Sequence, residues 1–352
     1  MIRFGPAGIP LSCKGRTLRD GIEDVHNLGL TAMEAQLVRA HVQERPAEAE
    51  EIGVKPKNLA SDMVIEIVRK KGDKEQVISD LDEPIKRGDT LVTLTSGIAK
   101  SYRELRELKS MADELDVALS IHTPYYMDLV GEGELAFRSM DSVKWGGIMA
   151  RDLGATVVVT HMGLYGDASP KAAQKKIKER VSELAKWYKR NGISVPIGLE
   201  LSGRQEIFGS LPEVLKTCKE VEGVIPVVNF AHYHARENGI LREPKDFNEL
   251  LDKIWEFVDG EFYTHFSGVE HEGGNEKRFT SIKKGDLRFE PLAEAIVDRN
   301  QPITIISGSP LLEHDAMYMK VILERVLAKR VSKETKDAKE AKYNKKEKAG
   351  SR

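Results

Sequence analysis

Short apolar, β-branched segments alternate with longer segments of helical periodicity along most of the chain. The helical pattern is clearest in residues 171–190 and 211–221, where apolar side chains recur every three or four positions. The apolar segments have the length of strands, and their continuous hydrophobic character indicates parallel strands covered on both faces. The predicted strands are residues 2–5, 31–37, 118–122, 156–160, 196–200, 225–229, 262–265 and 303–307.

Eight strands alternating with helices form either a closed (β/α)₈ barrel or an open doubly wound sheet. The open sheet that binds dinucleotides carries a Gly-x-Gly-x-x-Gly turn after its first strand, and no such turn follows residues 2–5. The chain has 352 residues, which leaves room for a barrel of about 250 residues with additions. We therefore predict an α/β protein with a (β/α)₈ TIM-barrel fold over residues 1–328.

The connection between the second and third predicted strands is too long for one barrel unit. Eighty residues separate Leu37 from Ala118, whereas a strand–helix–strand unit takes roughly 30. A helix over 101–115 accounts for the usual crossover, and the surplus reads as alternating strands joined by turns. We predict a small β-rich insertion over residues 44–98. It contains no Cys or His, which excludes a metal-binding module built from those residues.

Charge is distributed unevenly along the chain. The net charge is −2, but residues 329–352 hold ten basic and four acidic side chains, so this segment carries +6 and the rest −8. The segment has almost no apolar content and is expected to be a disordered tail or a loosely helical arm. A basic tail suggests contact with a polyanion, although a solvated tail that only aids solubility explains the composition as well.

The cysteine count and the N-terminus narrow the class of protein further. Two cysteines, Cys13 and Cys218, exclude a disulfide scaffold and a multi-cysteine zinc module. The N-terminal residues contain no apolar run long enough for a signal peptide or a membrane span. We therefore expect a cytoplasmic protein without a membrane partner, and the sequence leaves its oligomeric state open.

Histidines and a glutamate collect at the predicted ends of strands. His122, His161 and His265 end or directly follow strands, and Glu200 ends another. In a barrel these strand ends converge on one opening, where catalytic groups gather. A single histidine at a strand end is usually an ordinary half-buried residue, but four such groups on four strands indicate a shared site. Imidazoles and a carboxylate can hold a divalent metal ion with an open coordination position.

Several segments match a known family in order and spacing: HTPYYMDL (122–129), THMGLYGD (160–167), GLELSGRQ (198–205), VVNFAHYH (227–234) and YTHFSG (263–268). Together they resemble the endonuclease IV family of apurinic/apyrimidinic endonucleases, within the wider xylose-isomerase-like barrel superfamily. The resemblance covers nearly the whole chain except the insertion and the tail. It implies a catalytic, metal-bridging role for Glu200 and a DNA contact for Tyr125. The implied metal ligands are His122, His161, Glu200, Asn229, His232 and His265.

The chain departs from the family where a third metal is held. The family's Asp-Arg-His has no imidazole counterpart in EKRFTSIKKGDL (276–287), and Gly308 stands where a glutamate follows the eighth strand. Asn229 also replaces the family's aspartate. Substitute ligands could come from His234, His271 or Glu276. We therefore expect one or two divalent ions rather than three, with zinc first and manganese or iron as alternatives.

Three functions are compatible with these residues. The first is a metal-dependent phosphodiesterase that cuts DNA on the 5′ side of abasic sites, with Arg204 and Arg236 contacting phosphates. The second is a metal-dependent sugar isomerase or epimerase, although Glu200 is the only carboxylate at a predicted strand end, and proton transfer at carbon usually takes two. The third is a non-catalytic relative that binds nucleic acid. Loss of ligands would accompany relaxed catalytic demand.

Overall fold

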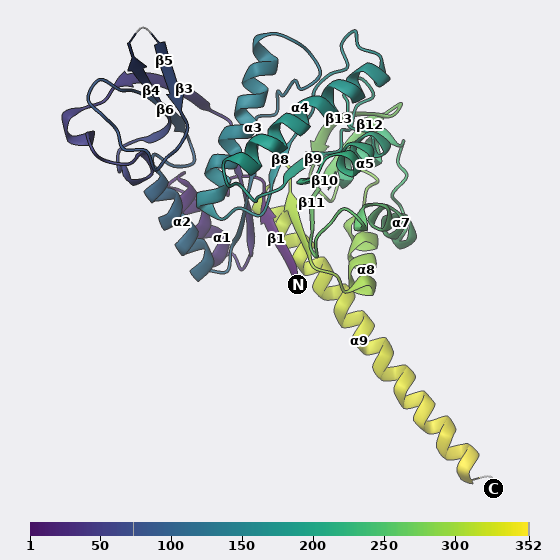
Figure 1. Ribbon diagram of the computed structural model, residues 1–352. Coiled ribbons are helices and arrows are strands. Elements are labelled where there is room, and N and C mark those ends of the chain that lie inside the picture. The colour runs from purple at the N-terminus through teal and green to yellow at the C-terminus, as the bar shows by residue number, and fades with distance from the viewer. Residues whose placement is uncertain (73, 351–352) are drawn as a thin grey trace.

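The computed structural model describes residues 1–72 and 74–350 and shows a barrel of parallel strands surrounded by helices (Figure 1). Its strand order is β1-β14-β11-β10-β9-β8-β7-β2, and a parallel bridge between Ala7 and Glu34 joins the two outer strands. The barrel strands are β1 (Ile2–Pro6), β2 (Ala32–Gln36), β7 (Ala118–His122), β8 (Val158–Thr160), β9 (Ile197–Glu200), β10 (Val224–Asn229), β11 (Phe262–Phe266) and β14 (Ile303–Ser307). The predicted (β/α)₈ fold is confirmed.

The helices pack through one apolar face each. In α4 the buried side chains recur at helical spacing from Ala173 to Tyr188, and the Ser169 side chain caps its first turn. The remaining face of this helix is solvated, which accounts for its many lysines. The helices are α1 (Leu18–Asn27), α2 (Tyr102–Glu114), α3 (Glu134–Leu153), α4 (Pro170–Arg190), α5 (Leu211–Glu220), α6 (Phe230–Arg236), α7 (Pro244–Trp255), α8 (Phe289–Arg299) and α9 (Glu313–Gly350).

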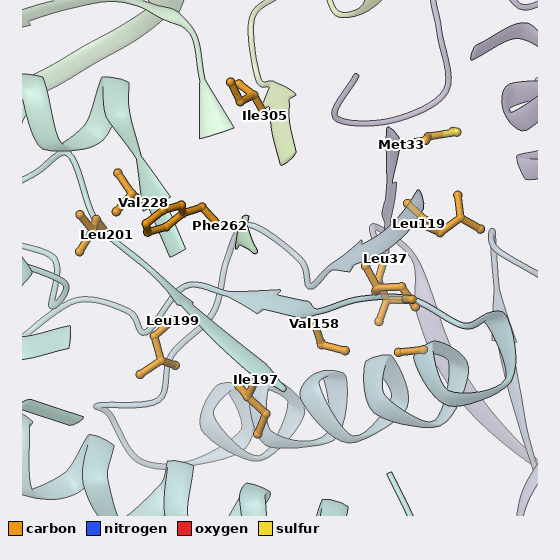
Figure 2. Packing of buried hydrophobic residues seen from close by; sticks show 14 of the residues in the cluster. Met33, Leu37, Leu119, Val158, Ile197, Leu199, Leu201, Val228, Phe262 and Ile305 are labelled. Carbon is orange, nitrogen blue, oxygen red and sulfur yellow. The ribbon is translucent and has the colours of Figure 1, made fainter. Parts of the chain in front are cut away.

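Strand side chains alternate between two apolar layers. Outward-facing residues such as Val158, Leu199 and Ile305 pack against the helices in the main core (Figure 2). Inward-facing residues form a second, smaller cluster inside the barrel, which includes Val159 and Val227. Because successive side chains on a strand point to opposite faces, residues two positions further along each strand continue the inward layer. This layer becomes polar toward the carboxyl ends of the strands.

The surplus between β2 and β7 is a separate antiparallel sheet in the order β3-β6-β4-β5. Its elements are β3 (Ala40–Pro46), two short 3₁₀ turns (Ala49–Glu51 and Pro56–Asn58), β4 (Met63–Lys71), β5 (Lys74–Ile78) and β6 (Thr90–Ser96). The sheet has its own small core around Ile67 and Leu91. It is attached to the barrel through Tyr102 of α2, whose hydroxyl donates to the Val64 carbonyl at 3.0 Å. The sheet thus occupies the stretch for which a β-rich insertion is expected.

The basic C-terminal segment continues α9 as a helix through Gly350. Residues 329–350 are therefore helical in the structure, which is the helical arm of the two expectations for this segment, and residues 351–352 lie outside the described residues. Ala316, Met319 and Leu323 bury the first part of α9 against the barrel. Because α9 follows β14 and runs back along the barrel, its later turns extend past the amino ends of the strands (Figure 1). The basic segment thus points away from the strand ends that carry the polar layer.

A β-hairpin follows β11 and is absent from the strands predicted by the sequence pattern. Its strands, β12 (Gly268–Glu272) and β13 (Asn275–Thr280), pair antiparallel and contact α6. The hairpin therefore brings residues 270–280 over the carboxyl ends of β10 and β11. No helix within residues 1–72 and 74–350 combines the length and apolarity that a bilayer span requires.

Candidate metal centre

Glu200 is the hub of a buried polar cluster at the carboxyl ends of the strands. It ends β9 and is 2% exposed. Its Oε2 lies 3.0 Å from Nε2 of His122 and 3.2 Å from Nδ1 of His161. Its Oε1 lies 3.0 Å from Nδ1 of His265. The strand ends thus bring together the four groups that the sequence singled out.

The electrostatics of the hub favour an ionised carboxylate. Burial alone raises the pKa of the Glu200 carboxyl, but the surrounding imidazoles of His161, His265 and His122 outweigh burial and hold it well below its usual range. Burial lowers the pKa of His161 to about 4, so this imidazole is neutral at pH 7. A neutral imidazole beside an ionised carboxylate offers two lone pairs to a cation.

His122 has its ring fixed for coordination. Its Nδ1 lies 2.7 Å from the Thr123 carbonyl oxygen, which can only accept, so Nδ1 carries a hydrogen. Its Nε2 then faces Glu200, where a proton or a cation belongs between the two acceptors. One atom each from His122, His161 and Glu200 lies within 4.8 Å of the other two. Two imidazoles and a carboxylate with an open side suit a divalent metal ion of the zinc type.

Two further carboxylates pair with histidines next to this hub. Nδ1 of His232 contacts Oε2 of Glu276 from the β12–β13 hairpin. Nε2 of His265 lies 2.7 Å from Oε2 of Glu34, a β2 residue that is 1% exposed. Burial would lower the pKa of each histidine, but the carboxylates outweigh it and raise both, that of His265 to about 10. The site therefore holds three carboxylates: Glu200 at a strand end, as the sequence predicts, and in addition Glu34 and Glu276.

Asn229 does not have the orientation of a metal ligand. Its Nδ2 donates to Oε1 of Glu200 at 2.9 Å, and its Oδ1 accepts from the amides of Ala231 and His232 as the N-cap of α6. A reversed amide would place its oxygen against a carboxylate and its hydrogens against two N–H groups. In the structure Asn229 thus positions Glu200 and caps α6, and its role as an oxygen ligand stays a prediction.

His234 and His271 lie apart from the hub, which corrects their expected role as substitute ligands there. Nε2 of each lies within 3.3 Å of Oδ1 of Asp286, so the three form a separate group. Nδ1 of His234 accepts from the Leu241 amide at 3.2 Å, which leaves the ring hydrogen on Nε2. His271 hydrogen-bonds Asp286, but Nε2 of His234 is buried without a hydrogen-bond partner of suitable geometry. These three side chains are thus a second group that could hold a metal ion, separate from the hub.

The residues expected to contact DNA differ in how accessible they are in the structure. Arg236 is buried, and its guanidinium donates to the carbonyls of Arg204 and Ile207, so it holds the loop after β9 and is not available to a phosphate. Tyr125 is 55% exposed and packs edge-on against His161 with ring centroids 5.2 Å apart. The Arg204 side chain is 41% exposed. Tyr125 and Arg204 thus remain accessible beside the hub.

A cavity of about 780 Å³ opens next to the cluster. Its wall is largely apolar and includes Tyr125, Tyr126 and Leu164, while its polar groups include His161, Arg204 and Glu276. The cavity gives a ligand of small-molecule size access to the edge of the hub, where aromatic rings face charged groups.

Sequence reasoning missed Glu34. It considered only strand ends, whereas Glu34 lies inside β2 between Met33 and Ala35. A charged residue inside an apolar strand that is covered on both faces needs a buried partner, and that signal was available. Because alternate side chains of a strand point to the same face, Glu34 points into the barrel together with Ala32 and Gln36, and it therefore belongs to the polar layer.

Comparisons with known proteins agree with the fold. The chain is 24% identical over 245 residues to an uncharacterized protein of Methanocaldococcus jannaschii, covering 68% of this chain and 88% of that protein. Endonuclease IV from Thermus thermophilus superposes with a TM-score of 0.56 at 16% identity, covering 92% of this chain and 99% of that one.

A sugar enzyme superposes equally well. The 3-keto-D-glucoside 4-epimerase of E. coli gives a TM-score of 0.55 at 12% identity, covering 93% and 100% of the two chains. Residues 90–311 match the family described as xylose isomerase-like TIM barrel. The match spans most of the barrel and all the residues of the hub. The chain belongs to the xylose isomerase-like TIM barrel family.

Proposed function

We propose that this protein is a metal-dependent phosphodiesterase that cleaves DNA at abasic sites, as an endonuclease IV does. The observation that carries the proposal is the convergence of His122, His161 and Glu200 on one buried point beside an open cavity. These three side chains would hold the ion, with zinc as the first choice. A bound divalent ion acts as a Lewis acid toward a phosphoryl oxygen and lowers the pKa of a water.

The chain's own residues supply the rest of the site. The Thr123 carbonyl keeps a hydrogen on Nδ1 of His122 and thereby directs Nε2 toward Glu200. Asn229 donates to Glu200 and holds the carboxylate in place. Tyr125 offers an aromatic face beside His161 for a sugar or base of a displaced nucleotide, and Arg204 offers a guanidinium to a phosphate.

The same geometry favours one or two ions. Glu200 can bridge, with His122 and His161 on one oxygen and His265 on the other. A third position would have only His232 and Glu276, which already hydrogen-bond each other. Two protein ligands that already hydrogen-bond each other are too few to hold an ion tightly.

The sugar isomerase or epimerase alternative rests on the structures of such enzymes that resemble this fold. Proton transfer at carbon takes acid–base groups on two sides of the substrate. Glu34 lies behind His265 and already pairs with it, so it is not placed as the second of these groups. The phosphodiesterase therefore explains the residues better, and the epimerase becomes an outcome of the test.

The basic C-terminal segment does not enter this proposal. It extends from the amino ends of the strands, on the side of the barrel away from Glu200 (Figure 1). A DNA duplex at the cavity would therefore meet Arg204 and the rim of the barrel rather than α9.

The test combines metal analysis with an incision assay on a duplex that carries one abasic site. We expect at least one bound transition metal and cleavage on the 5′ side of the lesion. Glu200→Gln should abolish cleavage, whereas Glu183→Gln, on the exposed face of α4, should leave it intact. Bound metal without incision but with turnover of a ketose would favour the epimerase. Neither metal nor turnover would favour a non-catalytic, nucleic-acid-binding relative.

A further inference from the structure

Glu34 is a buried carboxylate that stands behind His265, on the far side of the ring from Glu200. Its Oε2 lies 2.7 Å from Nε2 of His265, while Nδ1 of the same ring lies 3.0 Å from Oε1 of Glu200. His265 is therefore held between two carboxylates, one on each ring nitrogen. All three side chains are less than 5% exposed.

The carboxylate of Glu34 is held by neutral donors. Its Oε2 also accepts from the Tyr263 hydroxyl at 2.8 Å, and its Oε1 accepts from Nε2 of Gln36 at 2.8 Å. The Tyr263 hydroxyl in turn lies 2.5 Å from Oγ of Ser120. Among the residues that the structure describes, no Lys or Arg forms an ion pair with Glu34, so His265 is the cationic partner available to this buried carboxylate.

The position of Glu34 determines what the two nitrogens of His265 can do. A carboxylate accepts hydrogen bonds and donates none when ionised, so the ring hydrogen belongs on Nε2. Nδ1, the other ring nitrogen, is buried without a hydrogen-bond partner of suitable geometry and lies 3.0 Å from Oε1 of Glu200. A nitrogen and a carboxylate oxygen at this distance hold a proton or a cation between them, and a metal ion at Nδ1 takes the place of that proton.

We propose that Glu34 is a positioning residue that makes Nδ1 of His265 a ligand of the second ion that the proposed function assigns to Glu200 and His265. The proposal rests on the metal centre of the proposed function but not on its substrate. A carboxylate on the second nitrogen of a ligating histidine fixes the tautomer and ring orientation and raises the basicity of the ligand.

Glu34 does not itself replace the missing strand-end glutamate. Its two oxygens already accept from His265, Tyr263 and Gln36, and the ring of His265 separates them from Glu200. The chain therefore lacks that ligand, and Glu34 instead raises the basicity of His265, a ligand that remains. This arrangement predicts a second ion that is bound more weakly than the first.

The test measures the binding of Co²⁺ to the metal-free full-length protein by titration, with the visible absorption of the bound ion as a second readout. Glu34→Gln removes the negative charge at nearly constant size. We expect the second equivalent of Co²⁺ to bind about 10–100-fold more weakly, with a changed spectrum and an unchanged first equivalent. An affinity within a factor of about three of the wild type would overturn the proposal.

Two further variants separate positioning from a general structural effect. Tyr263→Phe removes one hydrogen bond to Glu34 but keeps its charge, so it should weaken the second equivalent far less than Glu34→Gln. In a His265→Ala background, Glu34→Gln should cause no additional loss, because Glu34 acts only through that ring. An additional loss in the double variant would show that Glu34 acts independently and would overturn the proposal.

The wild-type protein offers a measurement that does not depend on any variant. NMR of the histidine ring nitrogens in the zinc-loaded protein should show a hydrogen on Nε2 of His265 and none on Nδ1. The opposite pattern would contradict the proposal. These readouts are independent of DNA cleavage: a protein that binds two ions without cutting abasic DNA would refute the proposed function and leave the role of Glu34 standing.

Discussion

His122→Ala should remove the thermal stabilisation that a divalent metal ion gives this protein. His122 supplies Nε2 to the group that it forms with His161 and Glu200, and its ring is already oriented through the Thr123 carbonyl. The variant keeps the other two ligands but opens a third position to water. An ion held by two protein ligands rather than three is bound much more weakly.

The magnitude follows from binding linkage. A free metal concentration of about 100 times the Kd stabilises the folded protein by about 2.7 kcal/mol. At an unfolding entropy of about 2.1 cal/mol/K per residue, a chain of 352 residues gains roughly 4 °C in Tm. If the variant binds on the order of 100-fold more weakly, the same concentration contributes only about 0.4 kcal/mol. Its Tm should then rise by less than roughly 1 °C.

The assay is a thermal melt of each protein with EDTA and with added Zn²⁺, and the quantity compared is the rise in Tm within each variant. This difference cancels any change that the substitution makes to the metal-free protein. His41→Ala, on the exposed face of β3, is the matched control and should keep the full rise. A full rise in His122→Ala, or no rise in the wild type with Zn²⁺, Mn²⁺ or Fe²⁺, would refute the reasoning.

Three more outcomes are expected. Burial lowers the pKa of His265, but Glu34 and Glu200 outweigh burial and raise it. A second ion at Nδ1 therefore displaces a proton, and its Kd, measured by titration, should fall as the pH rises; a Kd that does not change with pH would contradict this. Asp89→Asn should destabilise the insertion by about 3 kcal/mol in denaturant unfolding, since the buried carboxylate accepts from Arg69. Burial raises the pKa of Asp89, but Arg69 outweighs burial and lowers it below 3.8. The stabilisation is therefore present above pH 3.8 and is lost as the pH falls through the pKa that Asp89 has in the folded protein. Equal stability of the variant and the wild type at neutral pH would be inconsistent with this prediction. Deletion of residues 336–352 should leave metal content and abasic-site incision unchanged, and a loss of incision on the order of tenfold would show that α9 contributes to DNA binding.

The barrel could be predicted because buried parallel strands leave a direct record in the sequence. Runs such as those ending at His122, Glu200 and His265 are continuously apolar and then end on a polar residue. All eight strands were located to within one or two residues, since length and β-branching define them. The same strand ends identified the hub, because parallel strands in a barrel place their carboxyl ends at one opening.

The parts that could not be predicted depend on which atom of a side chain faces which neighbour. Asn229 occupies a ligand position in the sequence, but its amide caps α6 and donates to Glu200. Arg236 follows the strand end closely, but its guanidinium is used by loop carbonyls. The partner of Glu34 lies 231 residues away on another strand, so local patterning carries no information about it.

The hairpin after β11 illustrates a different limit. Its strands are short and only partly buried, with charged residues such as Lys277 and Arg278 on the surface. Exposed strands lack the apolar run that marks a buried one. Glu276 therefore reaches His232 through a turn that the sequence pattern does not reveal.

A divalent metal ion held by His122, His161 and Glu200 can be located by anomalous X-ray diffraction. Crystals of the protein prepared with Zn²⁺ would be measured on both sides of the zinc absorption edge. We expect an anomalous peak within coordination distance of Nε2 of His122, Nδ1 of His161 and Oε2 of Glu200. Crystals without a peak among these three side chains, at a zinc concentration that saturates the protein in solution, would contradict it.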